Sequence, residues 1–464
     1  MLDRHVQSEA AALTRSVAGT GWAGTPFADW FADRVEVNRC LVERVPLDEL
    51  RGWRFDPGTG NLAHESGRFF AVEGLHVQSS YGPVAEWRQP IINQDEIGIL
   101  GLLVREVDGR LHGLVQAKVE PGNITTVQVS PTVQATRSNY TQVHQGARTR
   151  YLDLFARPQD RVALVDVLQS EQGSWFLGKR NRNMVVQVAG EVPVGENHHW
   201  LPLHEIRRLL RIDALVNMDT RTVLSCLPFT FPPDRARPED DGIMAGLVRS
   251  LLGEGRARST LGEVLSWFTE AKSRHELTSR RIPLAGLAEW QRTPEEITHR
   301  EDRHFSIIGV RVEATEREVV GWDQPLFYPK GRGVVAFVVK NIDGLAHLLV
   351  HARFQAGLLD RVEMGPTVQC NPDNHPKSRP RFLDEVLHAP GERILFDAVQ
   401  TEEGGRFYRS ENRYLLVDAG EDFPEDVPDD FCWVTAAQLT ALQRHGYYVN
   451  VEARSLIACL QSLW

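Results

Sequence analysis

Cysteine is scarce in this sequence, with five residues in 464, and no two of them have the CxxC spacing. We therefore expect neither a disulfide framework nor a structural zinc site. Cys226 and Cys459 lie in apolar segments, which indicates buried, reduced thiols. No apolar run is long enough to span a membrane, and the N-terminal segment has charges where a signal peptide needs an apolar core. The sequence thus predicts a cytoplasmic protein with no membrane partner.

Positive charge is also in deficit, since 52 Lys and Arg face 62 Asp and Glu, for a net charge of −10. This balance argues against a general nucleic-acid surface. A local group of Arg and Lys could still bind the phosphates of a small ligand. With 42% hydrophobic and 25% charged residues, the composition is that of a globular protein of two or three domains.

The common catalytic signatures are missing as well. The sequence has no GxSxG, no HExxH and no GxxxxGK[ST], and no GxGxxG that follows a strand and opens a helix. A serine hydrolase, a zinc protease, a P-loop enzyme and a Rossmann cofactor site are therefore unsupported. The histidines form no metal-type cluster. We expect no cofactor and no metal.

What the sequence does contain is an internal duplication. Residues 87–134 align without a gap on residues 322–369, with 17 of 48 positions identical, and both stretches end in Pro-Thr-Val-Gln. Further matched segments are 30–53 with 267–290, 169–176 with 400–407, and 217–227 with 450–460. Each copy has close to 200 residues, which is long enough to bury a core of its own.

The domain bounds follow from this alignment. A proline-rich stretch at 228–233 and the charged stretch at 234–242 separate the copies. Helical spacing follows over Ile243–Leu252, and Gly253 is a plausible stop. We predict an N-terminal extension (1–24), a first repeat (25–230), a linker with a short helix (231–262) and a second repeat (263–464).

Inside each repeat the pattern predicts an α+β fold. A helix starts near Phe27–Phe31, and the Asp-Gly pairs at 108–109 and 343–344 predict hairpin turns. The expected strands of the first repeat are 69–77, 97–106, 111–119, 127–133, 162–170 and 184–188. The expected helices near the end of each repeat are 203–210 and 219–227, and 436–444 and 452–463.

One strand has a polar face in both repeats. A period of two groups the first-repeat residues His112, Leu114, Gln116 and Lys118, and the second-repeat residues His347, Leu349, His351 and Arg353. The opposite face is apolar and predicts core. A recurring basic face favours the wall of a pocket, and the alternative is the solvated face of an antiparallel sheet.

A loop rich in hydrogen-bond donors follows this region. Thr136, Arg137, Ser138, Asn139 and Tyr140 stand in the first repeat where the second has 371–375, which includes Asn371, Asn374 and His375. Arg137 can bind two phosphate oxygens, and its neighbours can bind sugar hydroxyls. The alternative is an ordinary polar loop.

Two further groups could contact a ligand. Trp53 and Trp290 are equivalent by the repeat, and either could stack under a nucleobase, although core packing is the usual place of a tryptophan. Lys179, Arg180 and Arg182 form a basic cluster, of which the second repeat keeps only Arg409 and Arg413. This asymmetry indicates that the two repeats no longer bind equally.

The segments 120–146, 169–176 and 217–227, with the second Pro-Thr-Val-Gln, resemble the NDP-hexose 2,3-dehydratases of deoxysugar biosynthesis in antibiotic-producing actinomycetes. The resemblance covers roughly residues 25–464. It implies two tandem Nudix-like domains, a homodimer, and two dTDP-sugar pockets per subunit of which one is an inactive relic. Neither repeat contains the glutamate-rich metal box of Nudix hydrolases, which disfavours a metal-dependent diphosphate hydrolase.

The resemblance implies a substrate, dTDP-4-keto-6-deoxyglucose, and a product that passes to a 3-ketoreductase. We place the active pocket in the first repeat, with Tyr140 or His144 as the base and Lys118 or Tyr140 as the donor to the C4 oxygen. Substrate binding is assigned to Thr136, Arg137, Ser138, Asn139, Lys179 and Arg182, with Trp53 or Trp290 against thymine. Alternatives are a second-repeat pocket around Trp290, Arg353 and Asn371–His375, a pocket completed by a dimer partner, and a non-catalytic nucleotide-sugar binding protein.

Overall fold

The computed structural model describes residues 22, 24–136, 149–156, 162–232, 236–238, 241–315, 320–375 and 379–464. Five residues that the sequence placed in the site, Arg137, Ser138, Asn139, Tyr140 and His144, lie outside these ranges. Within them the fold is α+β, as expected. None of the helices in the described ranges has the length and apolar character needed to cross a membrane.

The first repeat contains many strands and a few helices. Its strands are β1 (Cys40–Val45), β2 (Trp53–Phe55), β3 (Leu62–His64), β4 (Ala71–Ser79), β5 (Glu86–Asn93), β6 (Gly98–Val107), β7 (Arg110–Val119), β8 (Val127–Ser130), β9 (Val133–Ala135), β10 (Val162–Ser170), β11 (Phe176–Leu177), β12 (Arg180–Gln187) and β13 (His198–Pro202). Its α-helices are α2 (Pro26–Val37), α4 (Asp153–Ala156), α5 (Leu203–Leu209) and α6 (Met218–Ser225). A short 3-10 helix, η2, spans Leu47–Glu49.

The second repeat, which follows the linker, has a similar order of elements. The strands are β14 (Leu277–Ile282), β15 (Trp290–Arg292), β16 (Glu296–His299), β17 (Phe305–Ala314), β18 (Gly321–Pro329), β19 (Gly333–Ile342), β20 (Leu345–Phe354), β21 (Val362–Gly365), β22 (Val368–Cys370), β23 (Ile394–Thr401), β24 (Glu411–Asp418) and β25 (Phe431–Val434). The helices are α7 (Ile243–Leu252), α8 (Leu261–Arg274), α9 (Leu383–Leu387), α10 (Ala436–Leu442), α11 (Val451–Gln461) and the 3-10 turns η4 (Leu284–Gly286), η5 (Pro372–Asn374) and η6 (Gly391–Arg393).

Each repeat builds the same seven-stranded sheet. In the first, the order is β10-β12-β6-β7-β13, with β8 beside β7 and β9 beside β6. In the second, the order is β23-β24-β19-β20-β21, with β22 beside β19 and β25 beside β20. In both sheets one central pair is parallel, β12 with β6 and β24 with β19. The duplication read from the sequence is therefore also a duplication of topology.

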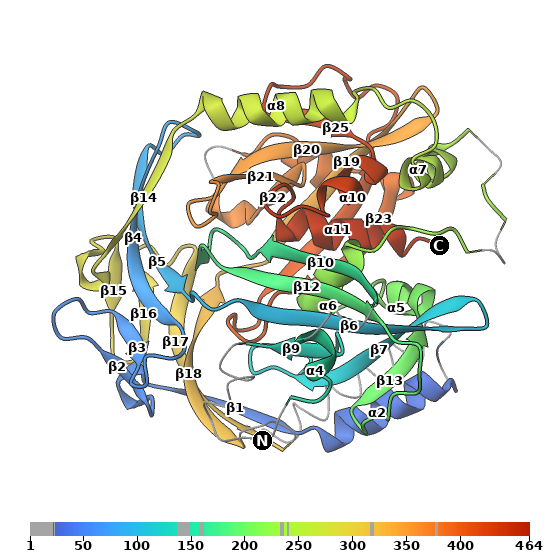
Figure 1. Ribbon diagram of the computed structural model, residues 1–464. Coiled ribbons are helices and arrows are strands. Elements are labelled where there is room, and N and C mark those ends of the chain that lie inside the picture. The colour runs from blue at the N-terminus through green and yellow to red at the C-terminus, as the bar shows by residue number, and fades with distance from the viewer. Residues whose placement is uncertain are drawn as a thin grey trace.

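The two smaller sheets exchange strands between the repeats. Strand β1 of the first repeat pairs antiparallel with β17 of the second, and the equivalent strand β14 of the second pairs with β4 of the first. Figure 1 shows both exchanges, with β14 beside the blue β4 and the blue β1 beside β17. The predicted bounds of the repeats follow chain order and stay a prediction. In space, each repeat needs a strand from the other to complete its smaller sheet.

Several local predictions are confirmed. Asp108 and Gly109 have φ values of 50° and 73°, as a type I′ turn between β6 and β7 requires, and Asp343 and Gly344 repeat this geometry. Helix α7 has the predicted bounds and ends at Gly253, which is left-handed with φ of 71°. Cys226 and Cys459 are buried free thiols.

The strand expected over 127–133 is instead two strands. Pro131 has no N–H to donate, and Thr132 takes the place of a main-chain link, because its hydroxyl accepts from Leu103 N at 2.8 Å and donates to Leu114 O. Thr367 makes the same two bonds, to Val338 N and Leu349 O. The shared Pro-Thr-Val-Gln is therefore scaffold in both repeats.

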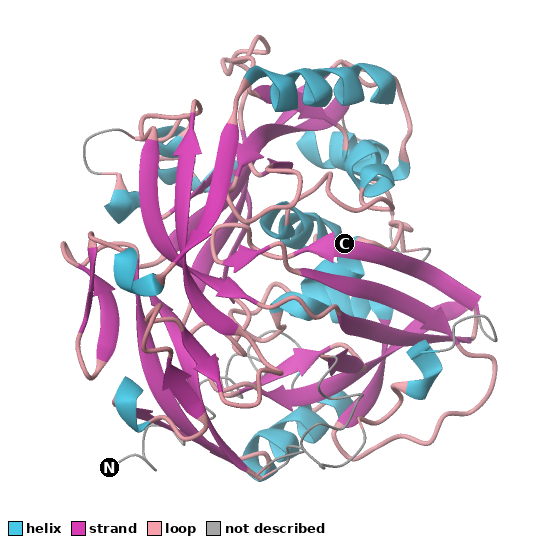
Figure 2. Ribbon diagram, turned by 60° about the vertical axis from the view of Figure 1, so that its left-hand side comes forward, coloured by secondary structure: helices cyan, strands magenta, loops and turns pink. Residues whose placement is uncertain are grey.

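The cores of the two repeats merge. One buried cluster contains Leu102 and Ile206 of the first repeat with Val310 and Ala458 of the second. Helices α6 and α11 pack against each other in the middle of the molecule (Figure 1). Figure 2 shows long strands of several sheets crossing the molecule, with helices packed along them. The repeats therefore share part of their apolar interior, and a cavity lies where they meet.

Candidate active site

A cavity of about 230 Å³ is walled by both repeats. Most of its wall comes from the first repeat, chiefly from β2, β6, β7, β9 and the start of α6. The second repeat contributes Trp322, Asp323 and Gln324 from β18, and Glu403, Gly405 and Arg406 from the loop 402–407. Cavities between packed elements that combine apolar and polar walls are the usual sites of small ligands.

One side of the cavity is aromatic. The ring of Trp53 lies 4.8 Å from that of Phe70 and 5.5 Å from that of His64, and His64 lies 4.5 Å from Phe69. The Trp53 indole N–H donates to the carbonyl oxygen of Asp323 at 2.8 Å. The ring is thereby fixed in place by the second repeat, and a group of this kind can stack on a nucleobase.

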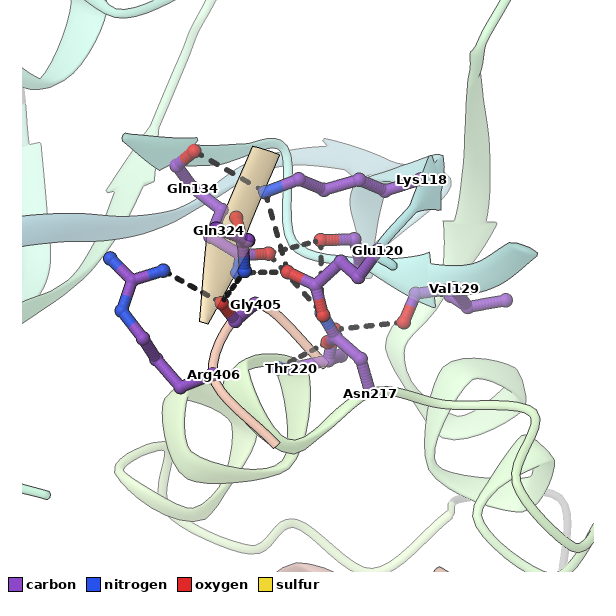
Figure 3. A network of polar contacts seen from close by, with 10 residues as sticks. Lys118, Glu120, Val129, Gln134, Asn217, Thr220, Gln324, Gly405 and Arg406 are labelled. Carbon is purple, nitrogen blue, oxygen red and sulfur yellow. Dashed lines mark hydrogen bonds and ion pairs between the residues drawn. The ribbon is translucent and has the colours of Figure 1, made fainter. Parts of the chain in front are cut away.

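Another part of the wall carries a network of polar contacts (Figure 3). Lys118 Nζ lies 3.8 Å from Glu120 Oε1 and donates to the carbonyl oxygen of Gln134 at 3.4 Å. The amide of Gln134 donates to Glu120 Oε1 at 2.6 Å and accepts from Asn217 at 3.2 Å. These contacts hold the ammonium of Lys118 and the carboxylate of Glu120 at the cavity wall.

Lys179 adds a second ammonium group. Its Nζ donates to the carbonyl oxygen of Glu96 at 2.5 Å. Burial lowers the pKa of Lys179, and the negative charges of Glu403, Glu171 and Glu96 oppose this shift.

Three carboxyl groups near these cations have raised pKa values. Burial is the main cause for Asp219, Glu403 and Glu171, and the pKa of Glu171 rises to about 7. The charges of Glu403, Glu120 and Glu171 add to the effect of burial on the pKa of Asp219, and the charge of Glu120 adds to it on the pKa of Glu403. A raised pKa brings a carboxyl group closer to the range in which general acids work, and clusters of such groups in a cavity are typical of functional sites.

Arg406 lies between the aromatic and the charged sides. Its guanidinium is 4.3 Å from the centre of the Phe70 ring, and its Nε donates to Gln94 Oε1 at 3.2 Å. Burial lowers the pKa of Arg406, against the charges of Glu403, Glu96 and Glu120. A guanidinium lining a cavity offers a phosphate several N–H donors.

The equivalent positions around the second repeat have lost most of these charges. The duplication pairs Glu96 with Gly331, Glu120 with Gln355, Lys179 with Ser410, Glu403 with Gln172, and Arg406 with Trp175. Trp175 packs 4.8 Å from Phe305 and 5.4 Å from Phe407. An aromatic side chain therefore fills the position from which Arg406 reaches the first cavity.

The structure brings part of the predicted site together. Trp53, Lys118, Thr136 and Lys179 all line the cavity. Residues 137–148 follow directly after Thr136. Arg182 is not among the lining residues, and its guanidinium pairs with Asp166 at 2.5 Å.

The second-repeat residues do not line this cavity. Trp290 is buried and donates to the carbonyl oxygen of Arg88 at 3.1 Å. Asn371 binds the backbone of Asp373, and Asn374 accepts from His304 N. Burial of the imidazole lowers the pKa of His375, and the charge of Arg353 adds to this shift.

Only one member of the predicted polar strand face is a wall residue of this cavity. Lys118 lines it, but Leu114 is fully buried in the core and His112 lies near the hairpin turn. In the second repeat, His347 accepts from Arg258 N and is also structural. The face changes character along the strand because Leu114 shares a buried cluster with Leu152 and Phe155, whereas Lys118 lies at the cavity.

The sequence analysis missed Asp219, Glu403 and Arg406. A signal was present, since the aligned segments 169–176 and 400–407 differ at the positions of Glu403 and Arg406. Nothing in the alignment indicated that a loop of one repeat lines the cavity of the other. Among the described residues, no group of three or more His, Cys, Asp or Glu side chains is placed to hold a metal ion.

Comparison with known proteins identifies the family. The model of the NDP-hexose 2,3-dehydratase family matches residues 25–227 and again residues 261–460. The chain belongs to this family of enzymes, which confirms the resemblance read from its motifs.

Three relatives carry the name dTDP-4-dehydro-6-deoxy-α-D-glucopyranose 2,3-dehydratase. The relative from Streptomyces violaceoruber is 52% identical over 445 residues, 94% of this chain and 97% of its own. The relative from Saccharopolyspora spinosa is 50% identical over 448 residues, 95% of this chain and 92% of its own. The relative from Amycolatopsis orientalis is 46% identical over 470 residues, 99% of this chain and 95% of its own.

Proposed function

We propose that this chain is a carbon–oxygen lyase that removes water across C2 and C3 of dTDP-4-keto-6-deoxyglucose, and that it does so in the cavity walled mainly by the first repeat. The observation that carries the proposal is the charge difference between the repeats. Glu120, Lys179, Glu403 and Arg406 surround this cavity, where the second repeat's equivalents are Gln355, Ser410, Gln172 and Trp175.

The chemistry needs groups of the kinds found there. The C4 ketone acidifies the C3 proton, and the C2 hydroxyl lies in the β position for elimination. Loss of both gives an enol that tautomerises to a 2,6-dideoxy-3,4-diketo sugar without a redox cofactor. The enzyme must supply a base, an acid for the hydroxyl, and a donor to the C4 oxygen where enolate charge develops.

We assign roles to the residues along the cavity, from the nucleobase to the sugar. Trp53 and the neighbouring aromatic rings receive thymine, and Lys179 and Arg406 bind the diphosphate. Lys118 donates to the C4 oxygen, supported by its fixed position beside Glu120. Tyr140 or His144 is the base, and Thr136, Arg137, Ser138 and Asn139 bind the sugar. Their segment follows directly on Thr136 at the cavity wall, which supports this assignment.

Broader parts of the proposal rest on the family resemblance. Each repeat is a Nudix-like domain that has lost its metal box, and the chain forms a cytoplasmic homodimer whose product passes to a 3-ketoreductase. Arg182 can bind the substrate only if its ion pair with Asp166 breaks. The equivalent pocket of the second repeat, which carries fewer charges, contains Trp290, Arg353, Asn371, Asn374 and His375.

A coupled assay tests the function. Incubation with dTDP-4-keto-6-deoxyglucose, a 3-ketoreductase and NADPH should consume NADPH only when this protein is present. Substrate binding without turnover would instead favour a non-catalytic nucleotide-sugar binding protein.

A matched pair of variants tests the location. Lys118→Gln should lower kcat by about 100-fold, the usual effect of losing one donor to a developing oxyanion. Arg353→Gln, at the equivalent position of the second repeat, should leave kcat within about twofold. Equal losses of kcat in the two variants, or a loss in Arg353→Gln alone, would contradict the location of the active site in the first cavity. Tyr140→Phe and His144→Ala, assayed separately, identify the base, and full activity in both would reject that assignment.

A further inference from the structure

The acid that protonates the leaving hydroxyl is not among the groups assigned above. Asp219 lies in the first turn of α6 and lines the cavity from the first repeat. Glu403 lines it from the loop 402–407 of the second repeat. Within the described ranges, neither carboxyl group accepts or donates a side-chain hydrogen bond, in contrast to Glu120, which Gln134 and Lys118 hold.

The two carboxyl groups interact electrostatically. Burial is the main cause of the raised pKa of Asp219, which is only 3% exposed, and Glu403 is the strongest of the negative charges that raise it further. Two carboxyl groups at one buried site ionise less readily together than either would alone. The charges of Lys179 and Lys118 oppose the rise in the pKa of Glu403, and so favour Glu403 as the ionised member of the two.

The second repeat has lost this arrangement. Its equivalent of Asp219 is Glu452, but its equivalent of Glu403 is Gln172, whose amide cannot give up a proton at neutral pH. Gln172 instead donates to Glu402 at 3.0 Å. Glu452 does interact with another carboxyl group, since burial and then the charge of Glu402 raise its pKa to about 8, but neither Glu402 nor Glu452 lines the cavity that carries Lys118 and Lys179.

We infer that Asp219 and Glu403 form a carboxyl pair, one member from each repeat, that protonates the C2 hydroxyl as it leaves. This inference rests on the function proposed above. The base takes the C3 proton, the C3–H electrons form the C2=C3 bond, and the C2–O bond breaks. The oxygen leaves as water with the proton of the pair. As the enol tautomerises, its hydroxyl proton returns to the pair and C2 takes a proton from the base, after exchange with water, which restores both groups and completes the 3,4-diketo sugar.

The loop that carries Glu403 is fixed by contacts between the repeats. Gly404 O accepts from Gly122 N at 2.7 Å, and Arg409 N donates to Gly122 O at 2.7 Å. The second carboxyl group is thus placed by the packing of one repeat on the other. The first repeat alone therefore lacks one of the two carboxyl groups, that of Glu403.

The test separates proton removal at C3 from loss of the hydroxyl at C2. The substrate carries deuterium at C3, and its release to water is measured beside NADPH consumption in the coupled assay. Glu403→Gln and Asp219→Asn should each lower elimination by about 100-fold or more, the usual effect of losing a general acid. Each should still release the C3 deuterium, because the base is intact.

Two further readouts exclude a merely structural effect. Affinity for dTDP and the unfolding temperature should match those of the parent protein, and Glu403→Asp should recover part of the elimination. Glu392→Gln, an exposed carboxylate of the second repeat, is the matched control and should change nothing.

Other outcomes overturn the inference. Loss of deuterium release together with elimination, or loss of dTDP binding, would show that the pair does not act as the acid. Full elimination in both variants would do the same. If Lys118→Gln also retained full activity, the proposed location of the active site would fail as well, whereas loss in Lys118→Gln alone would leave that location standing.

Discussion

The backbone N–H of Gly122 in the first repeat donates a 2.7 Å hydrogen bond to the carbonyl oxygen of Gly404 in the second. The duplication repeats this bond in reverse, since Gly357 N donates to Gly173 O at 2.8 Å. The approach is so close that a Cβ on Gly122 would lie 1.7 Å from Phe407 O, and a Cβ on Gly357 would lie 1.9 Å from Phe176 O. Only glycine fits at these two positions, because the obstructing atoms belong to the backbone.

We expect Gly122→Ala to displace the loop 402–407 and with it Glu403 and Arg406. Stability should fall by about 1–3 kcal/mol, as for other overpacked sites, and turnover should fall with it. Gly357→Ala should cost similar stability but less activity, because its loop carries Gln172 and Trp175. Chemical unfolding and the coupled assay measure the two effects. Gly190→Ala, where a Cβ meets nothing within 4 Å, is the control, and equal activity in all three variants would contradict the expectation.

The paired tryptophans give a second prediction. Trp53 Nε1 donates to Asp323 O and Trp290 Nε1 donates to Arg88 O, each across the boundary between the repeats. Replacing either by Phe removes a buried donor and should cost about 1–2 kcal/mol of stability. Only Trp53→Phe should also weaken dTDP binding, by about five- to tenfold, because only Trp53 lines the cavity. Calorimetric titration with dTDP distinguishes them, and equal affinities would remove Trp53 from the nucleobase site.

Local features of the fold could be predicted from the sequence because they depend on neighbouring residues. The Asp-Gly hairpins, the helix over Ile243–Leu252 and the apolar face of the strand at 110–119 are of this kind. Strand β1 was not predicted, because four of its six residues point to partly or fully exposed surroundings and its partner β17 is more than 260 residues away in the sequence. Its stability comes from a contact that no local pattern contains.

The residues of the candidate site also divide into those that the sequence of one repeat indicates and those that depend on contacts between the repeats. Lys118, Thr136 and Trp53 could be proposed from the sequence because each lies in the repeat whose cavity it lines. Glu403 and Arg406 were missed because position-by-position comparison assigns each residue to its own repeat. The exchange of β1 and β14 places a loop of each repeat against the other, so the wall of the first cavity includes residues numbered above 400.

Asp323 gives a prediction about pH. Arg51 Nη2 and Arg311 Nη2 donate to its carboxylate at 2.8 and 2.9 Å. Burial acts to raise the pKa of Asp323, but the hydrogen bonds from the two arginines outweigh it and lower the pKa to about 2. Since the folded pKa lies below the ordinary value of 3.8, the ionised group stabilises the fold above that pH. This contribution is lost as the pH falls from about 4 towards 2.

We therefore expect the free energy of unfolding of Asp323→Asn to lie below that of the parent protein by a constant amount between about pH 5 and 7. The difference should shrink below pH 4. Urea unfolding across this range measures it. Asp429→Asn, whose carboxylate is 84% exposed, is the control and should show little difference at any pH. A gap for Asp323→Asn that stays constant down to pH 2.5 would contradict the ionic origin of the stabilisation.

The last prediction concerns a substitution that makes the first cavity resemble the equivalent position around the second repeat. Arg406 lies 4.3 Å from the Phe70 ring, and its counterpart Trp175 packs 4.8 Å from Phe305, the counterpart of Phe70. Arg406→Trp should therefore pack on Phe70, fill part of the 230 Å³ cavity and remove a cation, while the protein stays folded. We expect dTDP affinity to fall at least tenfold and turnover to become undetectable. Arg406→Lys keeps the positive charge without filling the space, and should retain measurable binding. Unchanged dTDP affinity in Arg406→Trp would show that the diphosphate lies elsewhere, because neither the lost charge nor the lost volume would then have touched the ligand.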